Sequence, residues 1–193
     1  MRLIVGITGA TGAIYGVRLL ERLREAGVET HLVISRWGLR TLLHETTWSR
    51  ERVEALAHAT YASADMGAAI SSGSFRTDGM IVAPCSAKTL AAIAHGFGDN
   101  LVHRAADVTL KERRKLVLLV REAPLSEIHL KNMLELARMG AVILPPMPAF
   151  YNHPASIADI VDHTVARALD QLGIEMKGQQ RWSGELSVGR AAE

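Results

Sequence analysis

The residues with the clearest chemical potential lie in a glycine-rich turn near the start of the chain. Three glycines are spaced as G-x-x-G-x-x-G over residues 6–12, and Thr8 and Thr11 add hydroxyl groups between them. An apolar run precedes the turn and a helical pattern follows it, so the turn joins a buried strand to a helix N-terminus. Unpaired N–H groups there attract anions, and glycine lets the backbone approach a phosphate closely. Residues 9–12 are therefore predicted to cradle a phosphorylated cofactor, the alternative being a tight turn without a ligand.

A second candidate anion site is the segment PCSAKT at residues 84–89. Ser86 can cap the helix that follows it, and Lys88 and Thr89 fall in the first turn of that helix. An ordinary helix cap without a ligand is the alternative. Cys85 in the same segment could be a nucleophile, but no histidine lies near it in the sequence to activate the thiol. A small, partly buried thiol is therefore the favoured interpretation.

Further along the chain, charged residues with anion-binding or proton-transfer chemistry stand out. Arg104 and Lys111 are seven residues apart on a predicted helix, so both project from one face, about 10 Å apart along the helix axis. Asp107 lies between them and offers ordinary ion pairs as the alternative. Arg121 and Glu122 end an apolar strand. There, arginine offers paired donors for a phosphate and glutamate can transfer a proton. The alternative is that both side chains are simply solvated.

The chain has no sequence pattern typical of a catalytic metal site. It contains no D-D-x-x-D motif, and its eight histidines show no H-x-H or H-x-x-x-H spacing. We therefore expect no divalent metal in the mechanism. A phosphate group would instead be held by arginine, lysine and backbone N–H groups.

Length and composition limit the possible classes of protein. The chain has 193 residues, is 48% hydrophobic and has a net charge of +2. One compact domain is expected over 1–173, followed by a polar tail over 174–193. The balanced charge argues against a nucleic-acid partner, and neither a signal peptide nor a membrane span is expected. The single cysteine excludes an internal disulfide and suits a reducing cytoplasm.

Strand and helix patterns alternate along the sequence. Strands are predicted over 2–7, 28–34, 79–84, 115–120 and 140–145. Helices are predicted over 13–26, 36–45, 50–58, 87–95, 101–113, 126–138 and 156–172. This alternation predicts a three-layer α/β/α sandwich with a parallel sheet, either flavodoxin-like or Rossmann-like. The Ser-, Ala- and Gly-rich stretch 60–78 is expected to be a functional loop.

In such sheets, ligands bind beyond the carboxyl ends of the strands. The segments expected at that rim are 8–12, Ser35, 84–89, Arg121 with Glu122, and 145–151. Arg167 lies at the edge of the apolar stripe of the last helix, so it could point back over the same rim.

With these motifs assembled, the chain resembles the flavin prenyltransferases of the UbiX family, including those that belong to phenolic acid decarboxylase operons. The resemblance covers residues 1–183 and is carried by four segments: GITGATGAIYG at 6–16, residues 70–94, residues 101–154, and the RW pair at 181–182. It implies a flavodoxin-like sheet and a homo-oligomer, commonly a dodecamer, with its sites between subunits.

The resemblance also implies an FMN site and a neighbouring site for dimethylallyl monophosphate. The residues that it assigns to FMN are Gly9, Ala10, Thr11, Ser35, Ser86, Ala87, Lys88, Thr89 and Arg121. The residues that it assigns to the prenyl phosphate are Arg104, Lys111, Tyr151, Arg167 and Trp182. Glu122 is implied as the proton-handling residue, and Thr11, Arg104 and Lys111 complete the implied catalytic set.

The implied reaction is metal-independent transfer of the dimethylallyl group to N5 and C6 of reduced FMN. The product, prenylated FMN, would serve a UbiD-type (hydroxy)arylic acid decarboxylase. Two alternatives share this fold: an FMN-dependent cysteine decarboxylase and a non-enzymatic flavin carrier. The former carries a P-x-M-N-x-x-M-W clamp, where this chain reads PPMPAFYN. An NAD(P)-dependent reductase is disfavoured because Ser35, and no acidic residue, follows the second strand.

Overall fold

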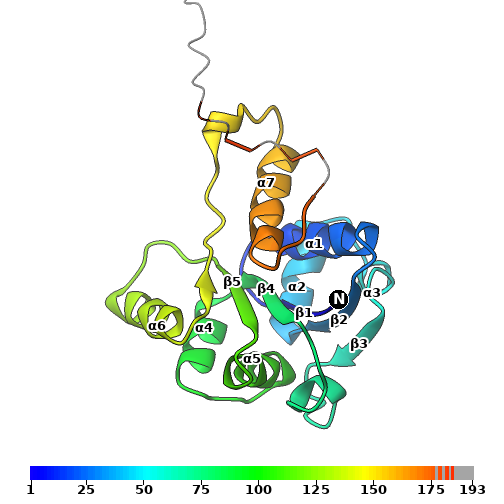
Figure 1. The fold of residues 1–193 in the computed structure, drawn as a ribbon, viewed down its shortest axis with the longest axis vertical. Coiled ribbons are helices and arrows are strands. Elements are labelled where there is room, and N and C mark those ends of the chain that lie inside the picture. Colours follow the sequence, from blue (N-terminus) through cyan, green and yellow to red (C-terminus); the bar gives the residue numbers. More distant parts are fainter. Residues whose placement is uncertain (177, 180, 183, 185–193) are drawn as a thin grey trace, which may run out of the picture.

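The centre of the molecule is a six-stranded, fully parallel sheet in the order β3-β2-β1-β4-β5-β6 (Figure 1). The computed structural model describes residues 1–176, 178, 179, 181, 182 and 184. The strands are β1 (Arg2–Ile7), β2 (Glu29–Ile34), β3 (Ala59–Ala62), β4 (Gly79–Cys85), β5 (Lys115–Val120) and β6 (Val142–Ile143). The order reverses between β1 and β4, as in the Rossmann-like form of the predicted class.

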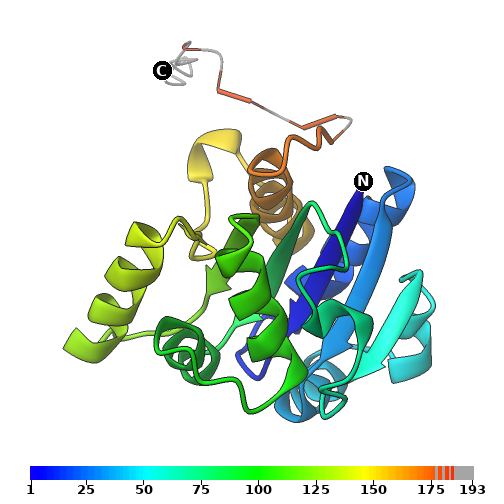
Figure 2. The same ribbon diagram turned by 60° about the horizontal axis from the view of Figure 1, so that its bottom comes forward.

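Helices cover both faces of the sheet, which confirms the predicted three-layer arrangement (Figure 2). One face is packed by α1 (Ala13–Glu25), α2 (Arg36–Glu45), α3 (Arg50–Glu54) and α7 (Ile157–Asp170). The other is packed by α4 (Ala87–Ala94), α5 (Leu101–Lys111) and α6 (Glu127–Arg138). Successive strand residues point to opposite faces, and here both faces are buried. The central strands therefore read as continuous apolar runs, which made them recognisable in the sequence.

The structure differs from the sequence prediction at the edges of the sheet. Strand β3 lies in the stretch that was expected to begin a loop, and its residues alternate between exposed and half-buried. An edge strand pairs on one side only and here buries no complete face, so the sequence ATYA carries no apolar run. At the other edge, β6 has two residues instead of the predicted six-residue strand over 140–145. The rest of the 60–78 stretch contains the short 3₁₀ helix Ala69–Ser71.

Between β6 and α7 the chain leaves the sheet and forms an arm over residues 144–156, drawn in yellow in Figures 1 and 2. It contains the short 3₁₀ helix Phe150–Asn152. Met147 is 71% exposed, Phe150 is 72% exposed and Ile157 is 80% exposed. Apolar surface of this kind commonly marks a contact with another molecule. Much of the tail predicted over 174–193 lies outside the described residues.

Candidate functional site

The turns that follow β1 and β4 are joined at the point where the strand order reverses. The Thr8 hydroxyl donates to the Pro84 carbonyl at 2.7 Å and accepts the Ser86 backbone N–H at 2.9 Å. The Thr8 backbone N–H donates to the same carbonyl at 3.2 Å. Thr8 is 1% exposed, so these bonds are buried and fix the two predicted anion turns against each other.

The neighbouring strand ends are fixed to this centre in the same way. The Ser35 N–H after β2 donates to the Ile7 carbonyl at 2.9 Å. On the other side, the Arg121 N–H after β5 donates to the Cys85 carbonyl at 3.0 Å. The structure therefore places the predicted FMN residues on one continuous rim at the carboxyl ends of β2, β1, β4 and β5, as the sequence predicted.

The first turn presents N–H groups that already hold an anionic group. Gly12 has φ +98°, a left-handed conformation that glycine adopts without strain, and it precedes α1. The Glu45 carboxylate accepts the N–H groups of Gly12 at 2.8 Å and Ala13 at 3.1 Å. Burial works to raise the pKa of Glu45, but hydrogen bonds from Thr11 and from these two N–H groups outweigh it and lower the pKa.

Sequence reasoning missed Glu45, which lies at the last position of α2, 33 residues from Gly12. Nothing in its local sequence marks it, because it ends an amphipathic helix like many other exposed glutamates. Only the packing of α2 against α1 brings its carboxylate to the turn. Gly9 shows the same packing, since a Cβ atom there would lie 2.5 Å from the Trp37 Cβ atom at the start of α2.

The second turn is both a helix cap and a cluster of polar side chains. The Ser86 hydroxyl caps α4 by accepting the Thr89 N–H at 3.3 Å, and it donates to the Thr89 hydroxyl at 3.1 Å. Lys88 lies 3.3 Å from Asp99 and its side chain is 75% exposed. Cys85 is fully buried, and burial raises the pKa of its thiol. The thiol is therefore a packing group, not a nucleophile.

Arg121 and Glu122 lie beside this rim at the end of β5. Glu122 is half-buried, and among the described residues its carboxylate accepts one hydrogen bond, from the Ala123 N–H at 3.1 Å. The positive charge of Arg121 acts on Tyr15 of α1, where burial nevertheless raises the pKa of the phenol. The charge of Arg121 therefore reaches α1, the helix that follows the first turn.

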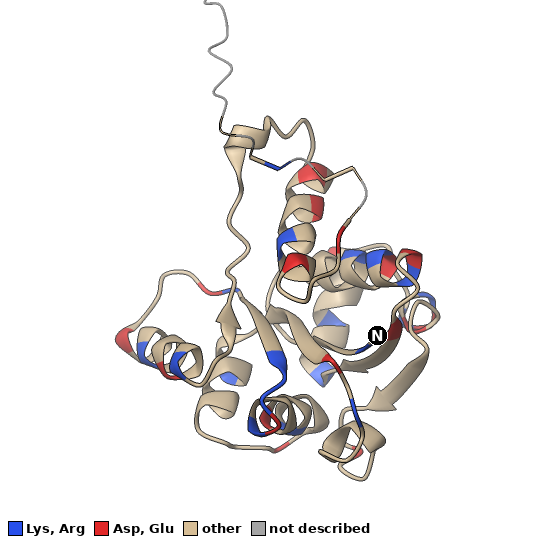
Figure 3. Ribbon diagram, viewed as in Figure 1, with Lys and Arg blue, Asp and Glu red and all other residues tan. Residues whose placement is uncertain are grey.

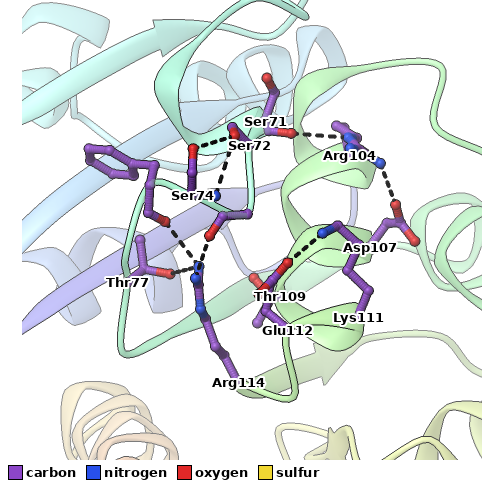
Figure 4. A network of polar contacts seen from close by, with 12 residues as sticks. Ser71, Ser72, Ser74, Thr77, Arg104, Asp107, Thr109, Lys111, Glu112 and Arg114 are labelled. Atoms are coloured by element: carbon purple, nitrogen blue, oxygen red, sulfur yellow. Dashed lines mark hydrogen bonds and ion pairs between the residues drawn. The ribbon is translucent and has the colours of Figure 1, made fainter.

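Arg104 and Lys111 lie elsewhere, on the side of α5 that faces residues 71–75 (Figure 4). The Arg104 guanidinium contacts Asp107 at 2.7 Å and the Ser71 carbonyl at 3.1 Å. The Lys111 ammonium contacts the Glu112 carboxylate. Within one chain, this helix face therefore carries the ordinary ion pairs that the sequence offered as the alternative. Among the described residues, Arg104 and Lys111 find their polar partners on α5, at its end and in the 71–75 segment.

Tyr151, Arg167 and Trp182 form a third cluster, which lines a cavity of about 400 Å³ together with His163, Gln179 and Arg181. The Tyr151 and Trp182 rings meet edge to face with centroids 5.7 Å apart. Arg167 contacts Asp170 at 2.8 Å. This ion pair lies within α7, and the Arg167 side chain also lines the cavity.

A single chain therefore gathers the predicted site residues into three clusters: the rim, the α5 face and the arm cavity. Figure 3 shows basic and acidic residues interspersed along α1, α5 and α7, in line with the net charge of +2. Among the described residues, no group of three His, Cys, Asp or Glu side chains could hold a metal ion. Within the same part of the chain, no helix is long and apolar enough to cross a membrane.

Known proteins are similar to this chain over nearly its whole length. The Flavoprotein family model matches residues 1–169. A probable UbiX-like flavin prenyltransferase of Bacillus subtilis is 62% identical over 184 residues, which cover 95% of this chain and 90% of the relative.

Two solved structures are also similar to this chain over nearly its whole length. The dodecameric FMN-dependent UbiX-like decarboxylase from Escherichia coli O157:H7 has a TM-score of 0.94 at 62% identity, covering 95% of this chain and 100% of that one. AnUbiX (PadA1), in complex with FMN and dimethylallyl pyrophosphate, has a TM-score of 0.94 at 55% identity, covering 96% of this chain and 98% of that one.

Proposed function

The chain belongs to the Flavoprotein family and, within it, to the UbiX-like flavin prenyltransferases, and on this basis we propose that it transfers a dimethylallyl group from dimethylallyl monophosphate to N5 and C6 of reduced FMN. The observation that carries the proposal is the 62% identity over 184 residues with the probable UbiX-like flavin prenyltransferase of Bacillus subtilis. Reduced FMN supplies the nucleophilic atoms, so the protein's task is to bind, orient and exclude water.

The two turns on the rim suit an FMN phosphate in their donor chemistry. In the first turn the N–H groups of Gly12 and Ala13 bind an anionic group, the Glu45 carboxylate. In the second turn Ser86 caps α4, and Lys88 carries an exposed ammonium group that pairs with Asp99. N–H groups, hydroxyls and cations of this kind bind phosphate. We assign FMN to the rim residues Gly9, Ala10, Thr11, Ser35, Ser86, Ala87, Lys88, Thr89 and Arg121.

The prenyl phosphate is assigned to the two remaining clusters. Arg104, Lys111 and Arg167 supply positive charge to the phosphate as the allylic C–O bond breaks and the electron pair leaves with it. Tyr151 adds a hydroxyl group, and Trp182 adds an aromatic wall for the prenyl chain. A monophosphate can be held by such side chains without a metal ion.

Each of these three cations has a carboxylate neighbour in its own part of the chain. The pairs are Arg104 with Asp107, Lys111 with Glu112 and Arg167 with Asp170. Such pairs hold the long side chains in place and limit the repulsion between cations that meet around one phosphate. The groups are thereby oriented before the substrate binds.

The α5 face and the arm cavity lie on opposite faces of the sheet, so we assign the complete site to the contact between subunits of a homo-oligomer, a dodecamer. The arm that carries Tyr151 also exposes the apolar side chains of Met147 and Phe150, which suit such a contact. Glu122 is half-buried on the rim, and among the described residues its carboxylate accepts one hydrogen bond, so it is positioned to take or give a proton. Thr11, whose hydroxyl group donates to Glu45, completes the proposed catalytic set.

The proposal extends to the fate of the product and the organisation of the chain. Prenylated FMN passes to a UbiD-type decarboxylase of (hydroxy)arylic acids, so this protein is a maturation factor and not the decarboxylase. We treat 1–173 as one flavin-binding domain with 174–193 as a tail. A buried free thiol suits the cytoplasm, where we place the reaction.

Mass spectrometry of the flavin tests the proposal directly. The protein is incubated without oxygen with reduced FMN and dimethylallyl monophosphate, and the flavin is then extracted. A mass gain of one isoprenyl unit supports the proposal. Recovery of unchanged FMN would indicate a flavin carrier, and release of carbon dioxide from a C-terminal cysteine substrate would indicate a cysteine decarboxylase.

A further inference from the structure

A buried histidine connects a surface carboxylate with the second turn of the rim. His103 lies in the first turn of α5 and is 2% exposed. Its Nδ1 atom lies 2.7 Å from Asp99 Oδ1, and its Nε2 atom lies 3.4 Å from Thr89 Oγ1. The Ser86 hydroxyl donates to Thr89 Oγ1 at 3.1 Å. A chain of polar groups therefore runs from Asp99 to Ser86.

When His103 is neutral, the hydroxyl groups of Thr89 and Ser86 donate in the direction of its ring. The Asp99 carboxylate can only accept, so the proton of a neutral ring resides on Nδ1 and Nε2 presents a lone pair. The Thr89 hydroxyl then donates to Nε2, and its oxygen accepts the Ser86 proton. Burial lowers the pKa of His103, against the opposing influence of Asp99, so this form prevails at neutral pH.

Protonation of Nε2 reverses the direction of the hydrogen bond between Nε2 and the Thr89 hydroxyl. The imidazolium has two N–H donors, one for Asp99 and one for the Thr89 oxygen. The Thr89 hydroxyl no longer needs to donate to the ring, so the protons of Thr89 and Ser86 can turn toward a ligand. An anion at the turn favours this state, because it accepts these hydrogen bonds and adds negative charge near the imidazolium.

We propose that His103 is a positioning residue for FMN, whose protonation turns the Thr89 and Ser86 hydroxyl protons toward the anionic part of the cofactor. FMN binding is then accompanied by uptake of one proton at His103. The inference rests on the proposed function, because it takes the turn at Ser86–Thr89 to be part of the FMN site. His103 itself contacts no ligand and acts through the two hydroxyl groups.

The charges that face His103 come from two elements. Asp99 precedes α5 and favours the imidazolium, whereas Lys88 of α4 disfavours it. Lys88 lies 3.3 Å from the second Asp99 oxygen, so Lys88 and His103 contact the same carboxylate. The Asn100 side-chain amide nitrogen lies 3.2 Å from Nδ1 and 3.3 Å from Nε2, and the Phe97 backbone also contacts the ring. Among the described residues, Asp99 and Lys88 are thus the charged groups that set its protonation.

The pH dependence of FMN affinity in the full-length protein tests the proposal. Calorimetric titrations with FMN are made from about pH 4.5 to 8.5, a range extended to lower pH because burial lowers the pKa of His103. As the pH falls, the wild type passes from neutral to protonated His103 and its affinity rises. We expect this rise to exceed that of His103→Gln by roughly three- to tenfold, since one unit of pKa shift corresponds to tenfold in affinity. The FMN phosphate titrates equally in both proteins.

Two further variants make the test specific. His95→Gln removes the histidine at the end of α4, which contacts Asn132 and not the turn, so it should follow the wild-type curve. Asp99→Asn keeps His103 but removes the carboxylate that favours the imidazolium, so the rise in affinity should move to lower pH. It also serves as the decisive variant should His103→Gln not fold.

The outcomes separate the inference from the proposed function. Identical pH profiles for wild type and His103→Gln, or an unshifted profile for Asp99→Asn, would overturn the role of His103 while leaving the flavin function intact. A wild type that binds no FMN at any pH would overturn the proposed function and this inference with it.

Discussion

The Glu45 carboxylate accepts the Gly12 backbone N–H at 2.8 Å, so the last residue of α2 caps the first turn of α1. The same carboxylate accepts the Ala13 N–H at 3.1 Å. A negative side chain therefore lies where an anionic ligand would gain most from the helix N-terminus. This relationship ties the stability of the turn to the protonation of Glu45.

Replacing Glu45 with glutamine should lower the free energy of unfolding by about 1 kcal/mol at neutral pH, the usual effect of losing a helix cap. The pKa of Glu45 is lowered in the folded protein, so its stabilising effect is present above the unfolded pKa and is lost as the pH falls through the folded value. Urea unfolding of both proteins at equal concentration, at pH 7 and in acid, measures this. Glu54→Gln, which breaks only the surface pair with Arg50, is the matched control and should cost less. A Glu45→Gln effect that persists unchanged in acid would contradict the prediction.

Replacing Glu122 with glutamine should leave FMN bound and reduce formation of prenylated FMN by roughly 10²- to 10⁴-fold, the range for loss of a proton-transfer group. Glutamine keeps the shape and the acceptor for the Ala123 N–H but cannot exchange a proton. Single-turnover assays with mass detection of the flavin measure the rate, and FMN fluorescence measures binding. Unchanged turnover would refute the role of Glu122.

Arg104→Met and Arg167→Met should each abolish measurable turnover at low substrate concentration, because each removes a cation from the departing phosphate. The α5 face and the arm cavity lie apart in one chain, so a site built between subunits takes these arginines from different copies. Oligomers assembled from a 1:1 mixture of the two variants should then regain about a quarter of the wild-type sites. No recovery in mixed oligomers, with mixing verified by mass spectrometry, would place both arginines in the same subunit.

Cys85 should not react with thiol reagents in the folded protein, because it is fully buried and burial raises the pKa of its thiol. Cys85→Ala should retain flavin prenylation and lose about 1 kcal/mol of stability from the small cavity that it creates. Colorimetric thiol titration before and after unfolding tests the first point. Rapid labelling of the native protein, or loss of turnover in Cys85→Ala with FMN still bound, would contradict the packing role.

Much of the fold could be predicted because its signals are local. Buried parallel strands such as β4 and β5 appear as unbroken apolar runs, and caps such as Ser86 lie beside the helices that they stabilise. We could predict that the two candidate anion turns lie on one rim. The prediction used the order of these elements and the rule that ligands bind at the carboxyl ends of the strands. Strand β3 had no such signal, because an edge strand with alternating exposure needs no apolar residues.

The amino-acid sequence by itself determined the α/β class, the glycine and serine turns and the set of charged residues predicted to bind an anion. Only the tertiary structure decided that Glu45 reaches Gly12 and that His103 reaches Thr89, and that the cations of α5 and of the arm form separate clusters in one chain. The reason is physical: helical periodicity and capping depend on residues within a few positions, whereas these meetings depend on how whole helices pack across the sheet.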